Sequence, residues 1–458
     1  MKLTIIFCLA IFLSVSAQAA VFTVNSNSDT NDANNGDGVC ADVSGNCTLR
    51  AAAQEANAMT SADTINFSLS GATTISLAFG EIFITESLVI DGANNLSINA
   101  NNQSRIFNIQ RGGISVAIRN LTVTNGRASD YGGGIYAAAG DLTVENAVIR
   151  NCFAQMNGGG IYSGSGVFRL LNSTVENNIV ATTGGSGGGV SVHGNNSEIR
   201  NSRILRNSAP RGGGVLIGSY TTKISETFIS ENSASVGGGG LLVTFSAARV
   251  SNSTISGNTA NGSGGGIALP YGNVILTNST VSGNRAVTGG GGGISTGTNG
   301  TVGYLTVKNS TVVNNTAIYA GGLTGGLASA TVIGNSIVAN NTANTAPNIF
   351  SFFTSLGGNI VNNRADGEGY VPTDLPDGTN PQIGTLANNG GATPTHALLA
   401  NSPAINAGLN ANAVDADGNS LTTDQRGAGF PRIVGTSVDI GAFEFSAALN
   451  IRKRKSGQ

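Results

Sequence analysis

The ionisable side chains that could work together are concentrated near the C-terminal end of the sequence. Asp424 and Arg426 are separated by one residue, and Asp439 follows thirteen residues after Arg426. Two carboxylates beside a basic group suit the cleavage of a glycosidic bond. We therefore take Asp424, Arg426 and Asp439 as the candidate catalytic residues. The same residue types also form internal ion pairs that hold loop-rich backbone together, and we favour that structural alternative.

Asp415, Asp417 and Asn419 are the candidate metal ligands. Their oxygen-bearing side chains alternate with other residues, as in the first part of a calcium-binding loop. The sequence lacks the distal glutamate that completes an EF-hand loop, which argues against a metal site of that kind. We therefore predict no cofactor and keep Ca²⁺ as the alternative.

The body of the chain offers little for acid–base chemistry. No Asp occurs between Asp141 and Asp366, and the glutamates of that stretch do not share one position of the repeat described below. Aromatic residues that could stack on a sugar are also scarce, because the 458 residues include no Trp. Tyr131, Tyr136 and Tyr162 form the one tyrosine cluster. These features favour a non-enzymatic role.

The composition excludes two large functional classes. The net charge is -2 and only 10% of the residues are charged, which leaves no basic surface for nucleic acid. Beyond the first twenty residues no apolar run is long enough to cross a membrane. The 67 glycines raise the question of disorder, but Val, Ile and Leu recur throughout, so a buried core is available.

The elements that must position these residues are repeats of about 26 residues. A glycine run followed by an aliphatic residue returns every 25 to 29 residues, from Ile135 to Leu323. An Asn-Ser-Thr motif, or a variant of it, returns with nearly the same period from Asn120 to Asn335. The residue two before this motif is aliphatic in every repeat, and the residue three after it is Val or Ile. Two independent markers therefore share one period.

Alternation within each repeat is typical of short β-strands. Val274 and Leu276 point to one face, whereas the next inward residue, Val281, lies an odd number of positions further on, which predicts a corner between them. Thr280 is expected to face outward. Short strands, Gly- and Asn-rich corners and a constant repeat length predict an all-β fold. It is a right-handed parallel β-helix whose coils stack at the spacing of paired strands, about 4.8 Å.

Stacked asparagines are expected at the corners of this solenoid. An inward Asn carries a donor and an acceptor, and can bond the Asn of the coils above and below. We predict such a structural ladder at Asn172, Asn201, Asn252, Asn278, Asn309 and Asn335. A second series lies six residues after the motif. Cys152 occupies one of its positions, which predicts a buried, unreactive thiol.

The first nineteen residues have the pattern of a secretory signal peptide. Lys2 precedes an apolar stretch, and the small-x-small sequence Ala-Gln-Ala ends at Ala19, so we predict cleavage after Ala19. The mature chain then reaches an oxidising compartment. There Cys40 and Cys47, separated by a turn-rich segment, are the natural disulfide pair.

The segment around these cysteines resembles a known family. Residues 36–58, with Cys40, Cys47, Thr48, Leu49 and Arg50, resemble the N-terminal CSLREX domain of secreted bacterial repeat proteins. Thr48 is a good N-cap residue, and the alanines after it predict a short helix that covers the first coil. The glycine and asparagine repeats are similar to those of the polymorphic outer-membrane proteins, which are adhesin-like β-helices.

The C-terminal part resembles the choice-of-anchor domain that follows such β-helices. The matching segments are 388–408, 423–427 and 438–444, with Asn406 where that family usually has Asp. The sequence therefore predicts five parts. These are a signal peptide (1–19), a CSLREX-like cap (20–63), parallel β-helix repeats (64–345), a choice-of-anchor-like domain (346–446) and a basic tail (447–458).

These patterns predict a non-enzymatic protein that is secreted or displayed on the surface of a bacterium, and that serves adhesion or binds matrix. The expected partner is an extracellular polysaccharide or another cell-surface ligand, with no nucleic acid and no transmembrane segment in the mature chain. One alternative is a polysaccharide lyase or glycoside hydrolase of the pectate-lyase-like β-helix type. The other is a passive structural protein of the cell surface.

Overall fold

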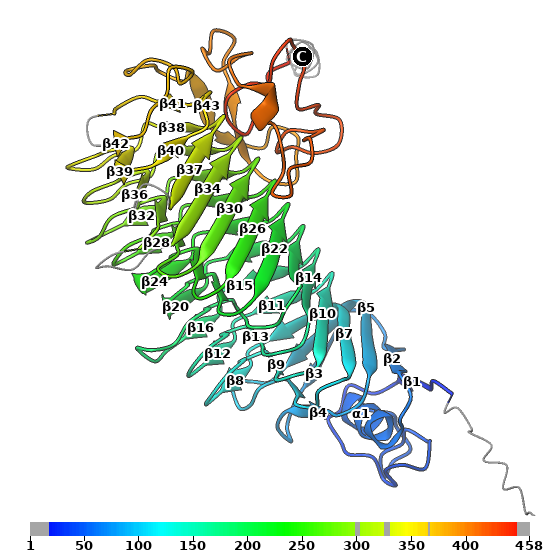
Figure 1. Ribbon diagram of the computed structural model, residues 1–458. Coiled ribbons are helices and arrows are strands. Elements are labelled where there is room, and N and C mark those ends of the chain that lie inside the picture. Colours follow the sequence, from blue (N-terminus) through cyan, green and yellow to red (C-terminus); the bar gives the residue numbers. More distant parts are fainter. Residues whose placement is uncertain (1–17, 298–302, 325–329, 365–366, 447–458) are drawn as a thin grey trace, which may run out of the picture.

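The computed structural model describes residues 18–297, 303–324, 330–364 and 367–446. Within these residues the chain winds into an elongated parallel β-solenoid of about 11 turns, with about 26 residues per coil (Figure 1). The predicted all-β parallel β-helix is confirmed. Apart from Gln18 and Ala19, the predicted signal peptide lies outside the described residues, as does the basic tail. No helix among the described residues is long and apolar enough to cross a membrane.

Three parallel sheets run along the solenoid. A twelve-stranded sheet contains β4 (Ile82–Ile84), β6 (Phe107–Ile109), β9 (Ile135–Ala137), β13 (Ile161–Ser163), β17 (Val190–Val192), β21 (Val215–Ile217), β25 (Leu241–Val243), β29 (Ile267–Ala268), β33 (Ile294–Ser295), β36 (Leu323–Thr324), β39 (Ile349–Phe352) and β42 (Gly367–Glu368). A seven-stranded sheet contains β8 (Arg127–Ala128), β12 (Phe153–Ala154), β16 (Ile179–Val180), β20 (Ser208–Arg211), β24 (Ser233–Gly237), β28 (Thr259–Ala260) and β32 (Arg285–Ala286).

The third sheet has 23 strands. A corner within each coil divides it into two ladders of stacked strands. The first ladder contains β1 (Val21–Val24), β2 (Asp63–Phe67), β5 (Leu88–Asn99), β7 (Ser115–Thr124), β10 (Asp141–Glu145), β14 (Phe168–Leu171), β18 (Ser197–Arg200), β22 (Thr221–Ser225), β26 (Ala247–Ser251), β30 (Asn273–Thr277), β34 (Tyr304–Lys308), β37 (Thr331–Gly334) and β40 (Thr354–Ser355). The second ladder contains β3 (Thr73–Ser76), β11 (Val148–Arg150), β15 (Thr174–Glu176), β19 (Arg203–Leu205), β23 (Phe228–Ser230), β27 (Thr254–Ser256), β31 (Thr280–Ser282), β35 (Thr311–Val313), β38 (Ile337–Ala339) and β41 (Ile360–Val361), and joins the long strands β5 and β7.

The bend between the two ladders falls at the asparagine of the Asn-Ser-Thr motif. Asn172 and Asn201 have φ of 50° and 47°, in the left-handed region that Asn tolerates better than most residues. Their side chains are exposed, and Asn201 Nδ2 donates to Asn172 Oδ1 across 2.8 Å. The prediction that these side chains turn inward is therefore wrong for Asn172 and Asn201. The left-handed backbone turns the corner and points the side chain outward.

The inward ladder is the second asparagine series. Asn178, Asn207, Asn232 and Asn258 are buried, and the Nδ2 of each donates to the Oδ1 of the next at 2.9 to 3.0 Å. Cys152 ends this series as a buried free thiol, and its backbone N–H donates to Asn178 Oδ1. Burial raises the pKa of that thiol to about 12. The other corner ladder members lie under the C-terminal segment, where Asn278 donates to Asn252 and Asn335 to Asn309.

The glycine runs form the corner before the strands of the twelve-stranded sheet from β9 to β36. Gly238 has a φ of 68°, and a Cβ added to Gly239 would lie 2.3 Å from the carbonyl oxygen of Gly265 in the next coil. Only glycine allows the coils to approach this closely at such a corner.

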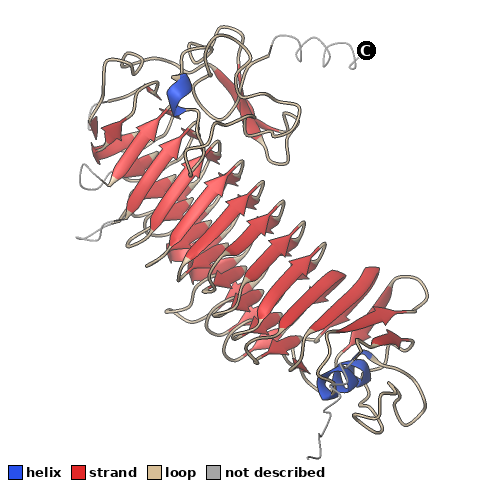
Figure 2. Ribbon diagram, turned by 45° about the vertical axis from the view of Figure 1, so that its right-hand side comes forward, coloured by secondary structure: helices blue, strands red, loops and turns tan. Residues whose placement is uncertain are grey.

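Both ends of the solenoid carry additional structure (Figure 2). Helix α1 (Leu49–Ala58) begins at the predicted N-cap Thr48 and buries Leu49, Ala52, Ala53 and Ala56 against the first strands. A disulfide joins Cys40 and Cys47, as predicted. At the other end the parallel ladders continue through β39 to β42, so the predicted end of the repeats at residue 345 is too early.

The C-terminal segment, residues 370–446, folds back over the outer face of the last coils. It contains the antiparallel pair β43 (Ile383–Ala387) and β44 (Thr395–Leu398) and the 3₁₀ helix η1 (Asn410–Asn412). Thr280 of β31 donates from Oγ1 to Gln425 Oε1 across 2.6 Å. Thr280 does face outward, but this segment buries it completely.

Candidate functional site

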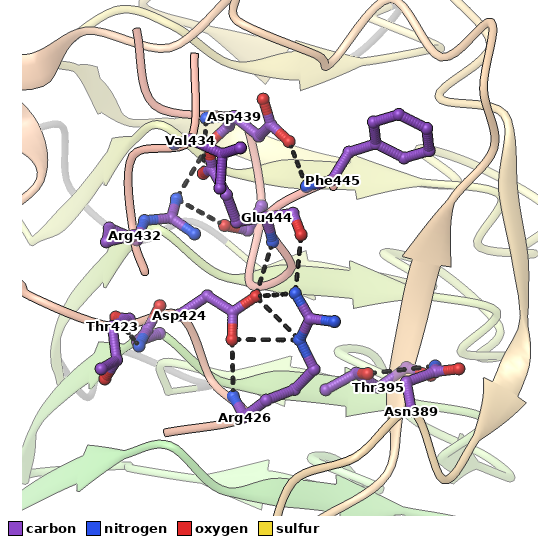
Figure 3. Close-up of polar contacts among 12 residues, drawn as sticks. Asn389, Thr395, Thr423, Asp424, Arg426, Arg432, Val434, Asp439, Glu444 and Phe445 are labelled. Atoms are coloured by element: carbon purple, nitrogen blue, oxygen red, sulfur yellow. Dashed lines mark hydrogen bonds and ion pairs between the residues drawn. The ribbon is translucent and has the colours of Figure 1, made fainter. Parts of the chain in front are cut away.

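Asp424 and Arg426, two of the candidate catalytic residues, form an ion pair inside the C-terminal segment (Figure 3). The Nε and Nη2 of Arg426 donate to Asp424 Oδ2 at 2.9 and 2.5 Å, and both residues are buried. The guanidinium lies over the rings of Phe430 and Phe443, 4.0 and 3.7 Å from their centroids. Both carboxylate oxygens of Asp424 and the Nε and Nη2 of Arg426 are thus committed to internal contacts, which suits the structural alternative.

Asp439 lies in the same buried cluster, beside Glu444 and Arg432 (Figure 3). Its carboxylate accepts hydrogen bonds from the backbone N–H groups of Asn406 and Phe445 at 2.7 and 2.6 Å. Burial raises the pKa of Asp439 and raises that of Glu444 to about 7. Burial also lowers the pKa of Arg432, although the neighbouring carboxylates oppose this shift. The cluster stabilises the loops of the segment and presents no carboxylate to a substrate.

The candidate metal ligands Asp415, Asp417 and Asn419 lie in one exposed turn. Asp415 Oδ1 accepts from the N–H groups of Asp417 and Asn419 at 2.8 and 2.9 Å, and Oδ2 accepts from Asn419 Nδ2. Partial burial raises the pKa of Asp415, but these hydrogen bonds outweigh it and the net pKa is lowered. Asp417 forms an ion pair with Arg249 of the solenoid. Within the described ranges no three His, Cys, Asp or Glu residues gather as metal ligands would.

A groove on the outer face of the twelve-stranded sheet is the better candidate site. One outward-facing residue from each successive coil forms a straight row in the strand register. The row consists of Phe83, Asn108, Tyr136, Tyr162, Ser191, Leu216, Leu242, Ala268, Ser295 and Thr324. Nine coil spacings of about 4.8 Å make it roughly 43 Å long. Most of these side chains are buried although they face outward. Pockets open over Phe83 at one end of the row and over Leu242, Ala268 and Ser295 further along it, and we call this face of the sheet the groove.

An aromatic stack stands near the N-terminal end of the row. The ring centroids of Tyr136 and Tyr162 are 5.4 Å apart, and His193 follows at 5.3 Å from Tyr162. Tyr131 packs 4.7 Å from Tyr162, so the tyrosines that the sequence groups together do meet. His193 Nε2 and Ser191 Oγ are hydrogen-bonded at 3.0 Å, and burial lowers the pKa of His193.

A cleft of about 640 Å³ adjoins this stack and holds two carboxylates. The guanidinium of Arg105 pairs with Glu81 across 2.6 Å and with Asp130, and it lies 4.9 Å from the ring centroid of Tyr136. Phe79 and Phe83 are exposed at the mouth of the cleft. A search for acidic residues confined to the Asp-free stretch misses Glu81 and Asp130, because they lie in the first coils.

A second pocket, of about 540 Å³, lies over β25 and β29. Leu242 and Ala268 form its apolar floor, and Phe245 and Tyr271 form one wall. These two rings are stacked with centroids 4.8 Å apart and planes 8° from parallel, yet they are 74% and 51% exposed. Arg211 is the one charged residue among the described residues that line the pocket.

The sequence contains a signal for this wall that the search for tyrosine clusters misses. Phe245 and Tyr271 are 26 residues apart, which is one coil, and both follow the strand after a glycine run. Two aromatic residues at the same position of adjacent coils must stack at the coil spacing. The repeat, and not proximity in the sequence, identifies the pair.

Among the comparisons with known proteins, the match to a family model supports the fold. Residues 188–366 match the family model described as right handed beta helix region. No curated protein matches the chain. Among solved structures, the chain is similar to pectate lyase Pel9A, with 16% identity and a TM-score of 0.48 over 94% of this chain and 98% of that chain. The chain is a β-helix repeat protein, and its fold agrees with the predicted right-handed form.

Proposed function

We propose that this β-helix binds an extracellular polysaccharide in the groove of its twelve-stranded sheet, as a secreted or cell-surface protein of adhesion or matrix binding. The pocket over β25 and β29 carries the proposal. It combines an apolar floor, Leu242 and Ala268, with two exposed rings, Phe245 and Tyr271. Large exposed apolar side chains beside a cavity mark binding surfaces more often than they serve stability.

The chemistry of the groove suits a carbohydrate chain. A pyranose ring has an apolar C–H face, which packs on aliphatic and aromatic side chains, and a rim of hydroxyls, which bond to hydroxyl and carbonyl groups. The row supplies both kinds of contact in line, because Tyr136 and Tyr162 precede Leu216 and Leu242 and Ser295 follows them. A straight groove along several coils accommodates a linear polymer better than a single small molecule.

A glycan array followed by titration tests this proposal. The best-bound oligosaccharide is titrated against the wild type, Phe245→Ala and Tyr271→Ala. The control is Tyr304→Ala, which removes an equally exposed ring outside the pocket. Each pocket variant should weaken binding by about tenfold or more, since an aromatic contact contributes on the order of 1 kcal/mol beyond its buried area. Failure of every glycan to bind, or equal losses in all three variants, contradicts the proposal.

The cleft beside Arg105 favours a second candidate function, the hydrolysis of a glycan. Glu81 and Asp130 flank one guanidinium at the edge of the groove, where a bound chain would pass. Hydrolysis by two carboxylates requires one of them as acid and the other as base or nucleophile. New reducing ends formed by the wild type and abolished in Glu81→Gln and Asp130→Asn would establish this activity. Binding without new reducing ends leaves the non-enzymatic proposal.

A further inference from the structure

The carboxylate of Asp63, at the start of β2, is buried without a countercharge. Asp63 is 0% exposed, and within the described part of the chain it has no ion-pair partner. Its Oδ1 accepts hydrogen bonds from the Ser61 hydroxyl at 2.6 Å and from the backbone N–H of Ala20 at 2.8 Å. Its Oδ2 has no hydrogen-bond partner among the described residues. An ionised carboxylate is costly to bury in this way unless a cation pairs with it.

Ala20 is held firmly at this place. Its carbonyl oxygen accepts from the N–H of Thr64 at 2.9 Å, and the next residue, Val21, begins β1 in parallel register with β2. The pairing of Ala20 and Val21 with β2 therefore holds the nitrogen of Ala20 beside the Asp63 carboxylate. Ala20 is also the residue that the cleavage motif makes the first of the mature chain.

We propose that removal of the signal peptide after Ala19 completes the N-terminal cap, because the new α-ammonium of Ala20 forms a buried ion pair with Asp63. Hydrolysis of the Ala19–Ala20 peptide bond consumes one water molecule. It leaves a carboxylate on Ala19 and a protonated amine on Ala20. In the uncleaved chain the amide nitrogen of Ala20 has one N–H, which donates a hydrogen bond to Oδ1 of Asp63. The ammonium has three, so it can bond Oδ1 and also reach the unpartnered Oδ2.

The inference rests on the predicted cleavage site and is independent of glycan binding. It assigns Asp63 the role of a sensor for the processed N-terminus. The ion pair would fasten β1 to β2 at the end of the solenoid where α1 covers the first coil, so the mature chain has a tighter cap than the precursor.

The test compares chains that differ only at the first residue. One is released from a fusion with Ala20 first, and the other carries one additional Gly before Ala20. Each is made with Asp63 and with Asp63→Asn, and backbone hydrogen exchange is measured in β1 and β2. The extra Gly should speed exchange in β1 by at least about tenfold in the Asp63 chains, the factor for a hydrogen bond to a charged group. In the Asp63→Asn chains it should have little effect.

Two controls keep the result unambiguous. Asp91→Asn changes a carboxylate of β5 that bonds Asn120, and should leave the full effect of the extra Gly. Acetylation of Ala20 removes the charge and keeps Asp63, so it tests the pair even if Asp63→Asn does not fold. Equal effects of the Gly in Asp63 and Asp63→Asn chains overturn the inference, as does unchanged exchange after acetylation. Mass spectrometry of the secreted protein that finds a first residue other than Ala20 also overturns it.

Discussion

At the scale of single residues, asparagine has two different roles in this solenoid. Asn172 and Asn201 turn a corner with positive φ and remain at the surface, whereas Asn207 and Asn232 fill the interior with a chain of amide hydrogen bonds. Both series recur once per coil, so the period alone predicts that they stack. The sequence could not predict which series faces inward, because that depends on the backbone conformation at the corner.

The interior ladder should contribute far more to stability than the surface one. Asn232→Ala leaves the N–H of Asn207 without its partner. It also removes one hydrogen bond each from Asn207 Nδ2, the carbonyl of Ile204 and Asn258 Oδ1. We expect a loss of about 3 kcal/mol or more in unfolding free energy, since each buried unpaired group costs roughly 1–3 kcal/mol. The control Asn201→Ala, at the surface, should cost about 1 kcal/mol. Urea unfolding followed by circular dichroism measures both, and equal losses would contradict the assignment.

At the scale of elements, the strands point alternate side chains into the core, and this much follows from the sequence. In β15, Val175 is completely buried and its neighbour Thr174 is partly exposed. The same pattern in β31 has a different consequence, because the C-terminal segment covers the outward Thr280. Contacts between residues 145 positions apart, such as Thr280 and Gln425, have no periodic signal that a sequence could show.

Val175→Asp and Thr174→Asp test the register in a coil that the segment leaves uncovered. The first places an unpaired charge in the core and should destabilise the protein by several kcal/mol, whereas the second should change stability by about 0.5 kcal/mol or less. Melting temperatures measured by calorimetry separate the two. A mild Val175→Asp or a severe Thr174→Asp would show that the inward and outward faces are exchanged.

The buried carboxylates of the C-terminal segment make its stability depend on pH. Burial raises the pKa of Glu444 to about 7, above its usual value near 4.5. The folded state therefore prefers the protonated acid. The favourable contribution of Glu444 to the free energy of unfolding is complete below pH 4.5 and is lost as the pH rises through 7. The loss amounts to roughly 3 kcal/mol. Burial also lowers the pKa of His396, which disfavours the folded state at low pH, so a comparison with a variant is required.

Glu444→Gln isolates this contribution. Relative to the wild type, the variant should gain stability steadily between pH 4.5 and 7.5, and Glu368→Gln, an exposed control, should show no such trend. Thermal unfolding across this pH range measures the difference. A constant difference between wild type and Glu444→Gln would mean that Glu444 does not titrate in this window.

At the scale of the whole molecule, the repeat predicts a rod but not where the rod binds. The coil length, the inward aliphatic residues and the helical cap follow from periodic or local signals. The groove does not, because its floor consists of outward residues that differ from coil to coil, from Tyr136 to Leu242 and Ser295. The sequence groups Asp424, Arg426 and Asp439 as candidate catalytic residues. In the structure Asp424 and Arg426 form an internal ion pair, which is the structural alternative.

Hydrogen exchange with and without a bound oligosaccharide tests the central claim most directly, since it reports where the glycan lies. We expect slower exchange in β21, β25 and β29 and in the turns that carry Phe245 and Tyr271. The ladder from β14 to β22, which belongs to another sheet, should be unchanged. Protection of the groove strands alone supports the account, whereas protection confined to the 23-stranded sheet or to the C-terminal segment would contradict it.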